Sequence, residues 1–237
     1  MDCAVMQPYL FPYLGYFQKM NMVDIFVVSD NVQYIKRGWI NRNRILVNNK
    51  EYMITFPVVK DSSKTEINKR YFVDDSHARK KILKTVHQNY QNAPHFKECY
   101  EILEMIIHYN NNNVLDYIMN SFELICAYID IHTSILLESE LEIPRDLNAE
   151  DTVIYICKIL NADRYINAIG GIELYSAQKF RENDITLKFI KVKESVRYNQ
   201  LNNFFVPNLS IIDVMMFNSK KEITKLLSEY KLIDGIY

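Results

Sequence analysis

The segment KRGWINRNR, residues 36–44, gathers the side chains with the clearest chemical meaning in the chain. It holds one lysine, three arginines, two asparagines and the only tryptophan. Guanidinium groups match phosphate oxygens with paired donors, and a flat indole can stack on a base or a sugar. A run of charge is most often a solvated surface, but the tryptophan and asparagines between the cations favour recognition, so we expect an anion site that a diphosphate would satisfy. Substrate-binding roles are predicted for Lys36, Arg37, Trp39, Asn41, Arg42, Asn43 and Arg44.

A second chemical segment is QPYLFPYLG, residues 7–15. Its two prolines fix φ, Gly15 allows the backbone to approach another group closely, and the amide of Gln7 can form paired hydrogen bonds. Tyr9 and Tyr13 add rings that could contact a ligand. A rigid connector whose tyrosines cover the edge of the core explains this loop equally well, so both interpretations stay open. Gln7, Tyr9 and Tyr13 are the predicted substrate contacts.

Two titratable residues, Asp30 and His87, are candidates for proton transfer. Asp30 ends the apolar run VDIFVVSD, and His87 stands three residues before Tyr90 on an expected helix, on the same side. Near-neutral titration suits a histidine to proton removal from an amine. A lone helical histidine is more often a packed or surface residue, and an acid such as Asp30 more often caps or pairs with an arginine. The structural alternative therefore stays open for both.

Several well-known motifs are absent from the chain. It has no GxGxxG for a dinucleotide, no GxxxxGK[ST] for a P-loop and no GxSxG for a serine hydrolase. HExxH and DxD are also missing, and the histidines and cysteines show no metal-binding spacing. The sequence therefore requires no metal and no cofactor.

The elements that would position these residues alternate between strand and helix. Strands are predicted at 3–7, 23–30, 132–139, 164–169 and 185–192. Helices are predicted between them at 15–22, 150–160 and 171–183. This alternation predicts an α/β fold with a mixed, largely parallel sheet of nucleotide-binding type.

The middle of the chain is helical and predicts an insert or subdomain at about 76–130 within a single domain of residues 1–237. Ser76 is the expected N-cap of its first helix, and Pro94 stands in the favoured early position of the second. Before this insert, RILVNN and KEYMITFPVV predict a hairpin that turns at the two asparagines between them.

The strand order decides which loops share an edge of the sheet. In open α/β sheets, ligands bind outside the carboxyl ends of the strands. The loop at 7–15, Asp30 and the glycines at 170 and 171 each follow a predicted strand. If those strands are parallel neighbours, the three segments meet. Gly170 then joins the predicted substrate-binding residues, and backbone N–H groups near Gly15 or Gly170 could stabilise an oxyanion.

Composition limits the classes of partner. The 237 residues are 49% hydrophobic and 24% charged, with a formal net charge of -1, so attraction to nucleic acid or to an anionic membrane is not expected. The four cysteines lie far apart, mostly in apolar runs, which favours reduced, buried thiols. No stretch reaches the ~18 apolar residues of a membrane span, and no signal peptide is evident, so a cytoplasmic location is expected.

Two long motifs resemble those of the WbqC-like protein family. The family opens with QPxYxPWxGYF and continues with DDVQFxKRxWxNRNRI, where this chain reads QPYLFPYLGYF and SDNVQYIKRGWINRNRI. The likeness continues through TFPV, HQNYQNAPHF, ESEL and FFVPNLSIIDVMMFN, and so covers nearly the whole chain. Gln33, inside the second motif, joins the predicted substrate contacts. The chain departs from the family at Tyr13, at Asn31 and at NAIGG, where the family often has tryptophan, a second acid and an SGPAG-like stretch.

The resemblance implies work on bacterial surface polysaccharides, because members of the family occur among genes for their synthesis. We therefore expect an acyl or aminoacyl transferase that modifies the amino group of a nucleotide-linked sugar for O-antigen or capsule. In this hypothesis the arginines hold the diphosphate, and Trp39 or Tyr9 stacks on the base or sugar. Asp30 or His87 accepts the amine proton, while Gln7 and the asparagines fix sugar hydroxyls. An activated acyl donor is expected, and an acyl-carrier partner or a homo-oligomer fits the same hypothesis.

Two other classes of function stay open. The first strand, loop and short helix are similar to the HxGH region of nucleotidylyltransferases, although tyrosines replace its histidines. A nucleotidylyl-type transferase, or a ligase that activates a carboxylate with ATP, is therefore the first alternative. The second is a non-enzymatic binding module of a polysaccharide assembly system, which a large exposed apolar patch without a deep pocket would favour.

Overall fold

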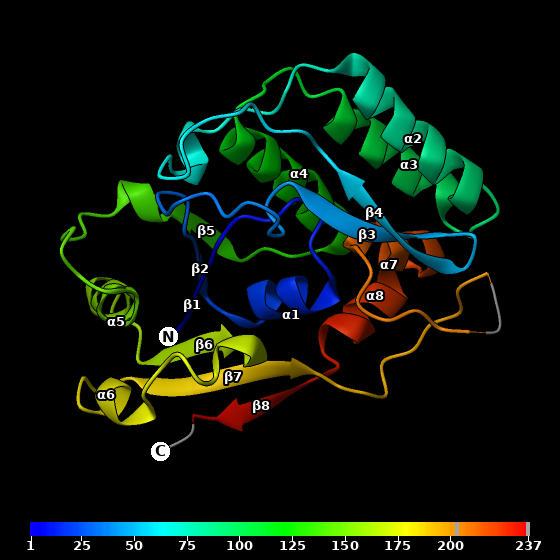
Figure 1. The fold of residues 1–237 in the computed structure, drawn as a ribbon. Helices are drawn as coiled ribbons and strands as arrows, with labels where there is room; N and C mark the ends of the chain where they lie inside the picture. The colour runs from blue at the N-terminus through cyan, green and yellow to red at the C-terminus, as the bar shows by residue number, and fades with distance from the viewer. Residues whose placement is uncertain (202–203, 236–237) are drawn as a thin grey trace.

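The computed structural model describes residues 1–201 and 204–235 and is built around a six-stranded sheet. Along the sheet the strands follow the order β5-β2-β1-β6-β7-β8 (Figure 1). Their bounds are Asp2–Met6 for β1, Ile25–Val28 for β2, Ser134–Leu137 for β5, Arg164–Ala168 for β6, Thr186–Val192 for β7 and Tyr230–Asp234 for β8. Neighbouring strands are parallel except β8, which runs antiparallel to β7. The predicted α/β fold with a largely parallel sheet is therefore confirmed.

The parallel strands are ordered as in doubly wound nucleotide-binding sheets. From β1 the chain adds β2 and then β5 on one side, and it then crosses over to add β6 and β7 on the other side. The direction of winding therefore reverses between β1 and β6. At such a reversal the neighbouring loops separate and leave a crevice at the carboxyl ends of the strands.

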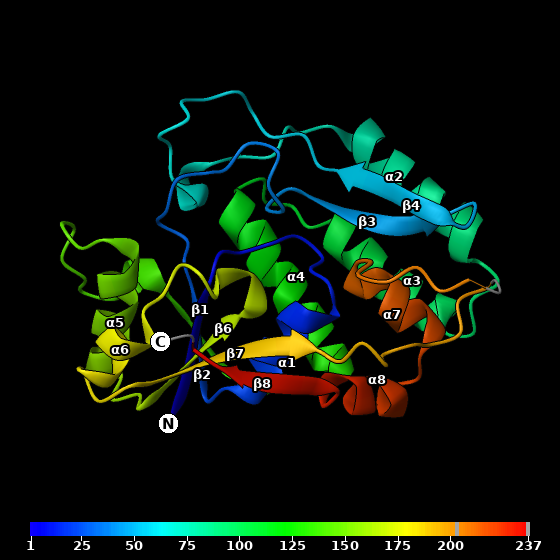
Figure 2. The same ribbon diagram turned by 60° about the horizontal axis from the view of Figure 1, so that its bottom comes forward.

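Helices cover both faces of the sheet. Cys3 and Val5 of β1 pack with α5 and α6 on one face, whereas Ala4 belongs to the larger core that includes α1 and α4. The helices span Leu14–Met22 for α1, Ser76–Tyr90 for α2, Phe96–Ile107 for α3, Val114–Ile129 for α4, Ala149–Ile159 for α5, Ala177–Arg181 for α6, Ile211–Phe217 for α7 and Lys220–Leu227 for α8. Figure 2 shows α5 and α6 side by side at one end of the sheet. Burial on both faces explains why the central strands read as continuous apolar runs.

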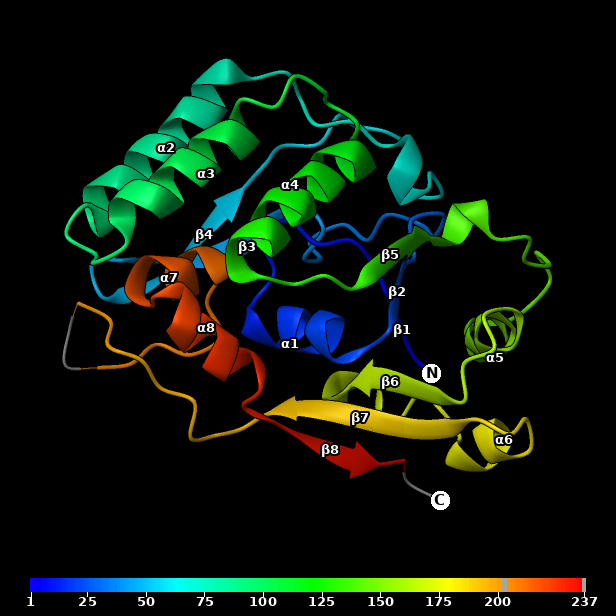
Figure 3. The same ribbon diagram turned by 180° about the vertical axis from the view of Figure 1, so that it is seen from behind.

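Three helices, α2 to α4, occupy the interval predicted for the insert, and Figure 3 shows them together on one side of the molecule. Their division from the sheet as a subdomain stays a prediction. The expected N-cap was wrong by one residue: Asp75 caps α2, because its Oδ1 accepts a hydrogen bond from the amide of Ala78 at 2.9 Å, and Ser76 is the first helical residue. Helix α3 begins at Phe96, two residues after Pro94.

The predicted hairpin forms a separate two-stranded sheet. Strands β3 (Arg42–Val47) and β4 (Lys50–Thr55) pair antiparallel, and Asn48 and Asn49 between them have φ of 48° and 65°. Asparagine is among the residues that tolerate positive φ best, which is why this pair makes the tight turn. The hairpin lies beside α2 in Figure 1.

The final part of the chain adds α7, α8 and β8, which the sequence reading did not predict. All seven residues of Ile211–Phe217 are buried, so α7 lacks the polar face that would mark a helix. The helix expected over 171–183 is shorter than predicted, because Ser176 accepts a hydrogen bond from Lys179 and starts α6 only there. Short 3-10 turns occur at Ile67–Lys69, Glu138–Glu140 and Ile169–Gly171. Across the described residues, no helix has the length and apolar content needed to cross a membrane.

Candidate functional site

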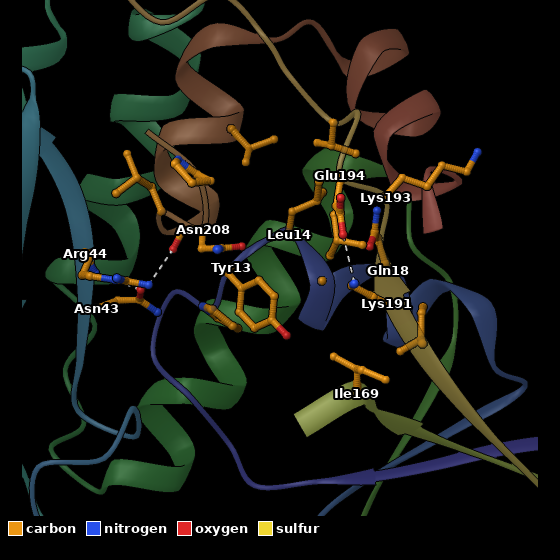
Figure 4. A pocket seen from close by; sticks show the side chains of 18 of the residues that line it. Tyr13, Leu14, Gln18, Asn43, Arg44, Ile169, Lys191, Lys193, Glu194 and Asn208 are labelled. Atoms are coloured by element: carbon orange, nitrogen blue, oxygen red, sulfur yellow. Dashed lines mark hydrogen bonds and ion pairs between the residues drawn. The ribbon is translucent and has the colours of Figure 1, made fainter. Parts of the chain in front are cut away.

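A pocket of about 740 Å³ lies at the carboxyl ends of β1, β6 and β7. Tyr9 and Tyr13 line it after β1, Gly170 lines it after β6, and Lys191 belongs to the end of β7. Strand β3, α7 and residues from 193–198 and 205–209 complete the wall. Figure 4 shows Arg44 at one end of the pocket and Glu194 at the other, with Tyr13 between them. The pocket therefore stands beside the crevice that the strand order creates.

The loop after β1 is held in one conformation by neighbours far away in sequence. Asn43 of β3 donates from Nδ2 to the carbonyl oxygens of Leu10 at 3.3 Å and Phe11 at 2.8 Å. The amide of Ile211 donates to the carbonyl of Pro12 at 2.8 Å. Phe11 adopts φ of 50°, a left-handed conformation that needs such support in a non-glycine residue. These bonds fix the loop so that Tyr9 and Tyr13 face the pocket.

Gly15 allows the ring of Tyr13 to lie against the first turn of α1. A Cβ at Gly15 would stand 2.4 Å from Cε2 of Tyr13 and 2.9 Å from Cγ2 of Val192. No side chain caps α1, and its first turn contains no acidic residue. The partial positive charge of this helix terminus is therefore available to an anion in the pocket.

Aromatic side chains form much of the pocket wall. Burial raises the pKa of Tyr9 and of Tyr13, so both phenols stay protonated at neutral pH. Trp39 is 40% exposed, and the guanidinium of Arg44 lies 5.2 Å from its ring centroid. Arg44 also pairs with Glu51 at 2.9 Å and donates to the carbonyl of Asn208 at 3.3 Å. The planes of Trp39 and Arg44 together offer a surface on which a flat ring can stack.

Three further cations line the pocket, from the end of β7 and the segment that follows it: Lys191, Lys193 and Arg197. They were not among the residues predicted from the sequence. Lys191 pairs with Glu194 at 3.1 Å, which lowers the pKa of that carboxyl, and Lys193 pairs with Glu229 at 2.9 Å. Arg197 donates to two backbone carbonyl oxygens at 2.8 Å each and, among the ion pairs of the described residues, has no carboxylate partner. The signal in the sequence was KVKESVR, residues 191–197, which begins in the last two residues of the predicted strand 185–192.

Six of the predicted substrate contacts come together in this pocket: Tyr9, Tyr13, Trp39, Asn43, Arg44 and Gly170. The other six lie outside its lining: Gln7, Gln33, Lys36, Arg37, Asn41 and Arg42. Asn41 is buried between the hydroxyl of Tyr34 at 2.8 Å and the carbonyl of Phe56 at 2.7 Å. Arg42 donates to the carbonyls of Gly38 and Arg37. These two residues shape the bend before the hairpin, and Lys36, Arg37 and Gln33 are exposed on it.

Asp30 is fully buried and lies outside the pocket lining. Its Oδ2 accepts from Nδ2 of Asn68 at 2.9 Å, and its Oδ1 accepts from the amide of Ser139 at 2.9 Å. The partners are thus two amides rather than the arginine considered from sequence. Nearby, burial and the charge of Asp30 raise the pKa of Glu138, while a hydrogen bond from Ser29 opposes this shift. These contacts give Asp30 a structural task at the ends of β2 and β5.

His87 also lies outside the pocket lining, on the exposed side of α2. Its ring meets the edges of Phe96 and Tyr100 with centroid distances of 5.3 and 5.5 Å. Tyr90 is fully buried, so the expectation that these two side chains share one side was wrong. The position of His87 provides no contact through which it could take a proton from a ligand in the pocket.

Comparison with known proteins agrees with the motifs of the first 45 residues. A "WbqC-like protein family" model matches residues 7–225. "Uncharacterized protein Rv1507c" of Mycobacterium tuberculosis (strain ATCC 25618 / H37Rv) is 27% identical over 219 residues, which cover 91% of this chain and 92% of that protein. No solved structure matches the chain significantly. Because the family model extends over most of its length, the chain belongs to the WbqC-like protein family.

Proposed function

We propose that this protein transfers an acyl or aminoacyl group to the amino group of a nucleotide-linked sugar used for bacterial surface polysaccharide. The observation that carries the proposal is the 740 Å³ pocket, which lies at the carboxyl ends of parallel strands and combines aromatic walls with four cations. The cations are Arg44, Lys191, Lys193 and Arg197. A nucleotide-linked sugar offers the complementary groups: a flat base, a diphosphate and a sugar.

The diphosphate would lie where positive charge converges. Arg197 lacks a carboxylate partner among the described ion pairs, and the uncapped start of α1 opens on the same pocket. Both features favour an anion over a neutral ligand. Trp39 and Tyr9 would then stack on the base or sugar, and Asn208 would stand near the hydroxyls.

The transfer step needs a proton acceptor within the pocket. The amine nitrogen attacks the acyl carbonyl carbon, a carbon–nitrogen bond forms, the bond from that carbon to the leaving group breaks, and the amine loses a proton. Asp30 and His87, the acceptors predicted from sequence, lie outside the lining, whereas Glu194 belongs to it. Lys191 lowers the pKa of Glu194, so this carboxylate is ionised at neutral pH but is a weak base, and it would hold the amine through its negative charge as the proton leaves. The amide of Gly170 is a donor for the oxyanion.

Trp39 supplies the test of ligand binding. It is the only tryptophan and lines the pocket, so its fluorescence reports on the site directly. We expect nucleotide-linked amino sugars to change this emission at lower concentration than the free sugar or the free nucleotide, and mass spectrometry to detect an N-acylated product when an acyl thioester is added. Unchanged emission across UDP-, dTDP- and GDP-linked amino sugars would refute the proposal.

The order of the strands favours a second candidate, a ligase that activates a carboxylate with ATP. Nucleotide-binding sheets of this winding commonly hold a nucleotide at the reversal between the first strand and the fourth in chain order. Here that position lies between β1 and β6. A fluorescence change with ATP and magnesium, together with pyrophosphate release that depends on a carboxylic acid, would select this candidate.

A further inference from the structure

One wall of the pocket is an irregular segment between β7 and α7. Arg197, Tyr198 and Phe205 of this wall line the pocket. The described part of the segment has no helix or strand between Val192 and Ile211, so backbone ladders do not fix its course. Contacts made by side chains must therefore hold these residues at the pocket.

The segment is tied to the core by the carboxylate of Asp213. This residue sits in α7 with no exposed surface. Its Oδ2 accepts from the hydroxyl of Tyr198 at 2.6 Å and from Nε2 of Gln200 at 2.7 Å, and its Oδ1 accepts from the hydroxyl of Tyr90 at 2.8 Å. All of these donors are neutral, and burial raises the pKa of Asp213. An acid without a cationic partner costs stability in a core, so its hydrogen bonds must matter.

Gln200 extends the tie along the segment. Its Nε2 donates to the carbonyl of Val206 at 3.0 Å, and its Oε1 accepts from the amide of Val206 at 2.7 Å. The ring of Phe205 meets that of Tyr198 edge to face at 5.0 Å, and the guanidinium of Arg197 lies 5.0 Å from the Phe205 centroid. Arg197 therefore rests on a ring that the Asp213 contacts hold in place.

The same carboxylate reaches the opposite wall of the pocket. The hydroxyl of Tyr90, which donates to Asp213, accepts a hydrogen bond from the amide of Leu46 at 2.7 Å. Leu46 belongs to β3, the strand that carries Asn43 and Arg44 into the pocket. One buried side chain thus links α7 with two segments that supply cations to the site.

We propose that Asp213 is a positioning residue that sets the pocket wall through Tyr198 and Gln200 and so aims Arg197 at the anionic group of the ligand. The claim that Arg197 points at an anionic group of the ligand rests on the proposed function. The claim that Asp213 holds the segment after β7 in place does not. An asparagine at 213 would present one oxygen and one NH₂ group to three donors, so at least one of the three bonds would be lost.

The experiment compares two tyrosine hydroxyls that donate to the same carboxylate. Tyr198→Phe removes the bond from Asp213 to the segment after β7, whereas Tyr90→Phe removes the bond from Asp213 toward α2 and β3 and is the matched control for exchange in that segment. Hydrogen exchange is measured on the full chain without ligand. We expect Tyr198→Phe and Asp213→Asn to speed exchange in 194–201 and 204–208 about tenfold or more, with α4 unchanged, because a hydrogen bond to a charged group is lost. Tyr90→Phe should leave the wall at its wild-type rate.

Affinity for inorganic pyrophosphate, a probe for the diphosphate, is the second measurement. Tyr198→Phe should weaken it about tenfold, because the segment that carries Arg197 loses a bond to Asp213. Wild-type exchange in the wall of Tyr198→Phe, or equal acceleration by Tyr90→Phe, would overturn the role of Asp213. If pyrophosphate does not bind the wild type, the proposed function loses its support while the exchange comparison still decides the positioning role. Tyr198→Phe keeps the test valid if Asp213→Asn does not fold.

Discussion

Lys19 provides a quantitative test of the packing between α1 and the sheet. Its side chain is 1% exposed, and its amine lies 3.5 Å from the carbonyl oxygen of Val5 and 3.1 Å from the sulfur of Met6. No carboxylate is among these contacts, and burial lowers the pKa of the amine from 10.5 to about 7. The fold therefore retains a lysine whose charged form is poorly solvated.

The size of the penalty follows from the change in pKa. Between 10.5 and about 7, at ~1.4 kcal/mol per pH unit, the charged amine costs the folded state up to ~5 kcal/mol. The unfolded chain holds this proton up to about pH 10.5, whereas the folded chain releases it above about pH 7. The penalty that Lys19 imposes on the folded state therefore shrinks, and the free energy of unfolding rises, as the pH increases from about 7 to 10.5. Below about pH 7 the full penalty applies.

We expect Lys19→Met to raise the free energy of unfolding, because methionine keeps the unbranched shape and removes the charge. At pH 6 the gain should approach ~5 kcal/mol, and at pH 9 it should shrink to ~2 kcal/mol, since the wild type no longer carries a folded-state proton there. Urea denaturation at both pH values measures the difference. Lys221→Met, a change at an exposed lysine of α8, is the control and should show little effect at either pH. Destabilisation by Lys19→Met at both pH values, or a gain that does not depend on pH, would refute this reasoning.

Two further predictions concern local packing and capping. Gly15→Ala should destabilise the fold by about 1–3 kcal/mol, because its Cβ would overlap the ring of Tyr13, whereas Gly170→Ala should be nearly neutral because no atom lies within 4 Å of its added Cβ. Thermal denaturation of the two variants compares them directly, and equal melting temperatures would contradict the close approach at Gly15. Asp75→Ala should cost ~1 kcal/mol through the lost cap of α2, and Ser76→Ala should cost less. A larger loss from Ser76→Ala in urea denaturation would show that the cap is assigned to the wrong residue.

The central strands were predictable because a strand that is buried on both faces reads as a continuous run of apolar residues in the sequence. VDIFVVSD shows it in β2, whereas ITLKFIKV alternates apolar and polar residues in β7, and both form parallel strands. Helix α7 escaped prediction because its burial removes the polar face by which helices are recognised. Asp213, inside SIIDVMMF, has no neighbour in sequence that explains it. Its three donors come from residues 90, 198 and 200.

The candidate site was predictable only where its residues share a segment. Trp39 and Arg44 stand in the basic motif at 36–44, and both line the pocket. Arg37 stands in the same motif with the same chemistry, yet the bend before β3 carries it out to solvent with φ of 63°. Lys191 and Arg197 become relevant only through the position of β7 beside β6, which sets the strand order and which local patterns do not encode.

The central claim is that the pocket, rather than the whole basic motif, binds the anionic ligand. Isothermal titration calorimetry with a nucleotide-linked amino sugar tests it most directly, with Arg44→Ala and Arg37→Ala as a matched pair from one motif. Arg44 lines the pocket, and Arg37 is exposed outside its lining. We predict that Arg44→Ala weakens binding at least ~10-fold, while Arg37→Ala leaves the dissociation constant within about twofold of the wild type. Equal losses from the two variants, or a loss from Arg37→Ala alone, would contradict the account.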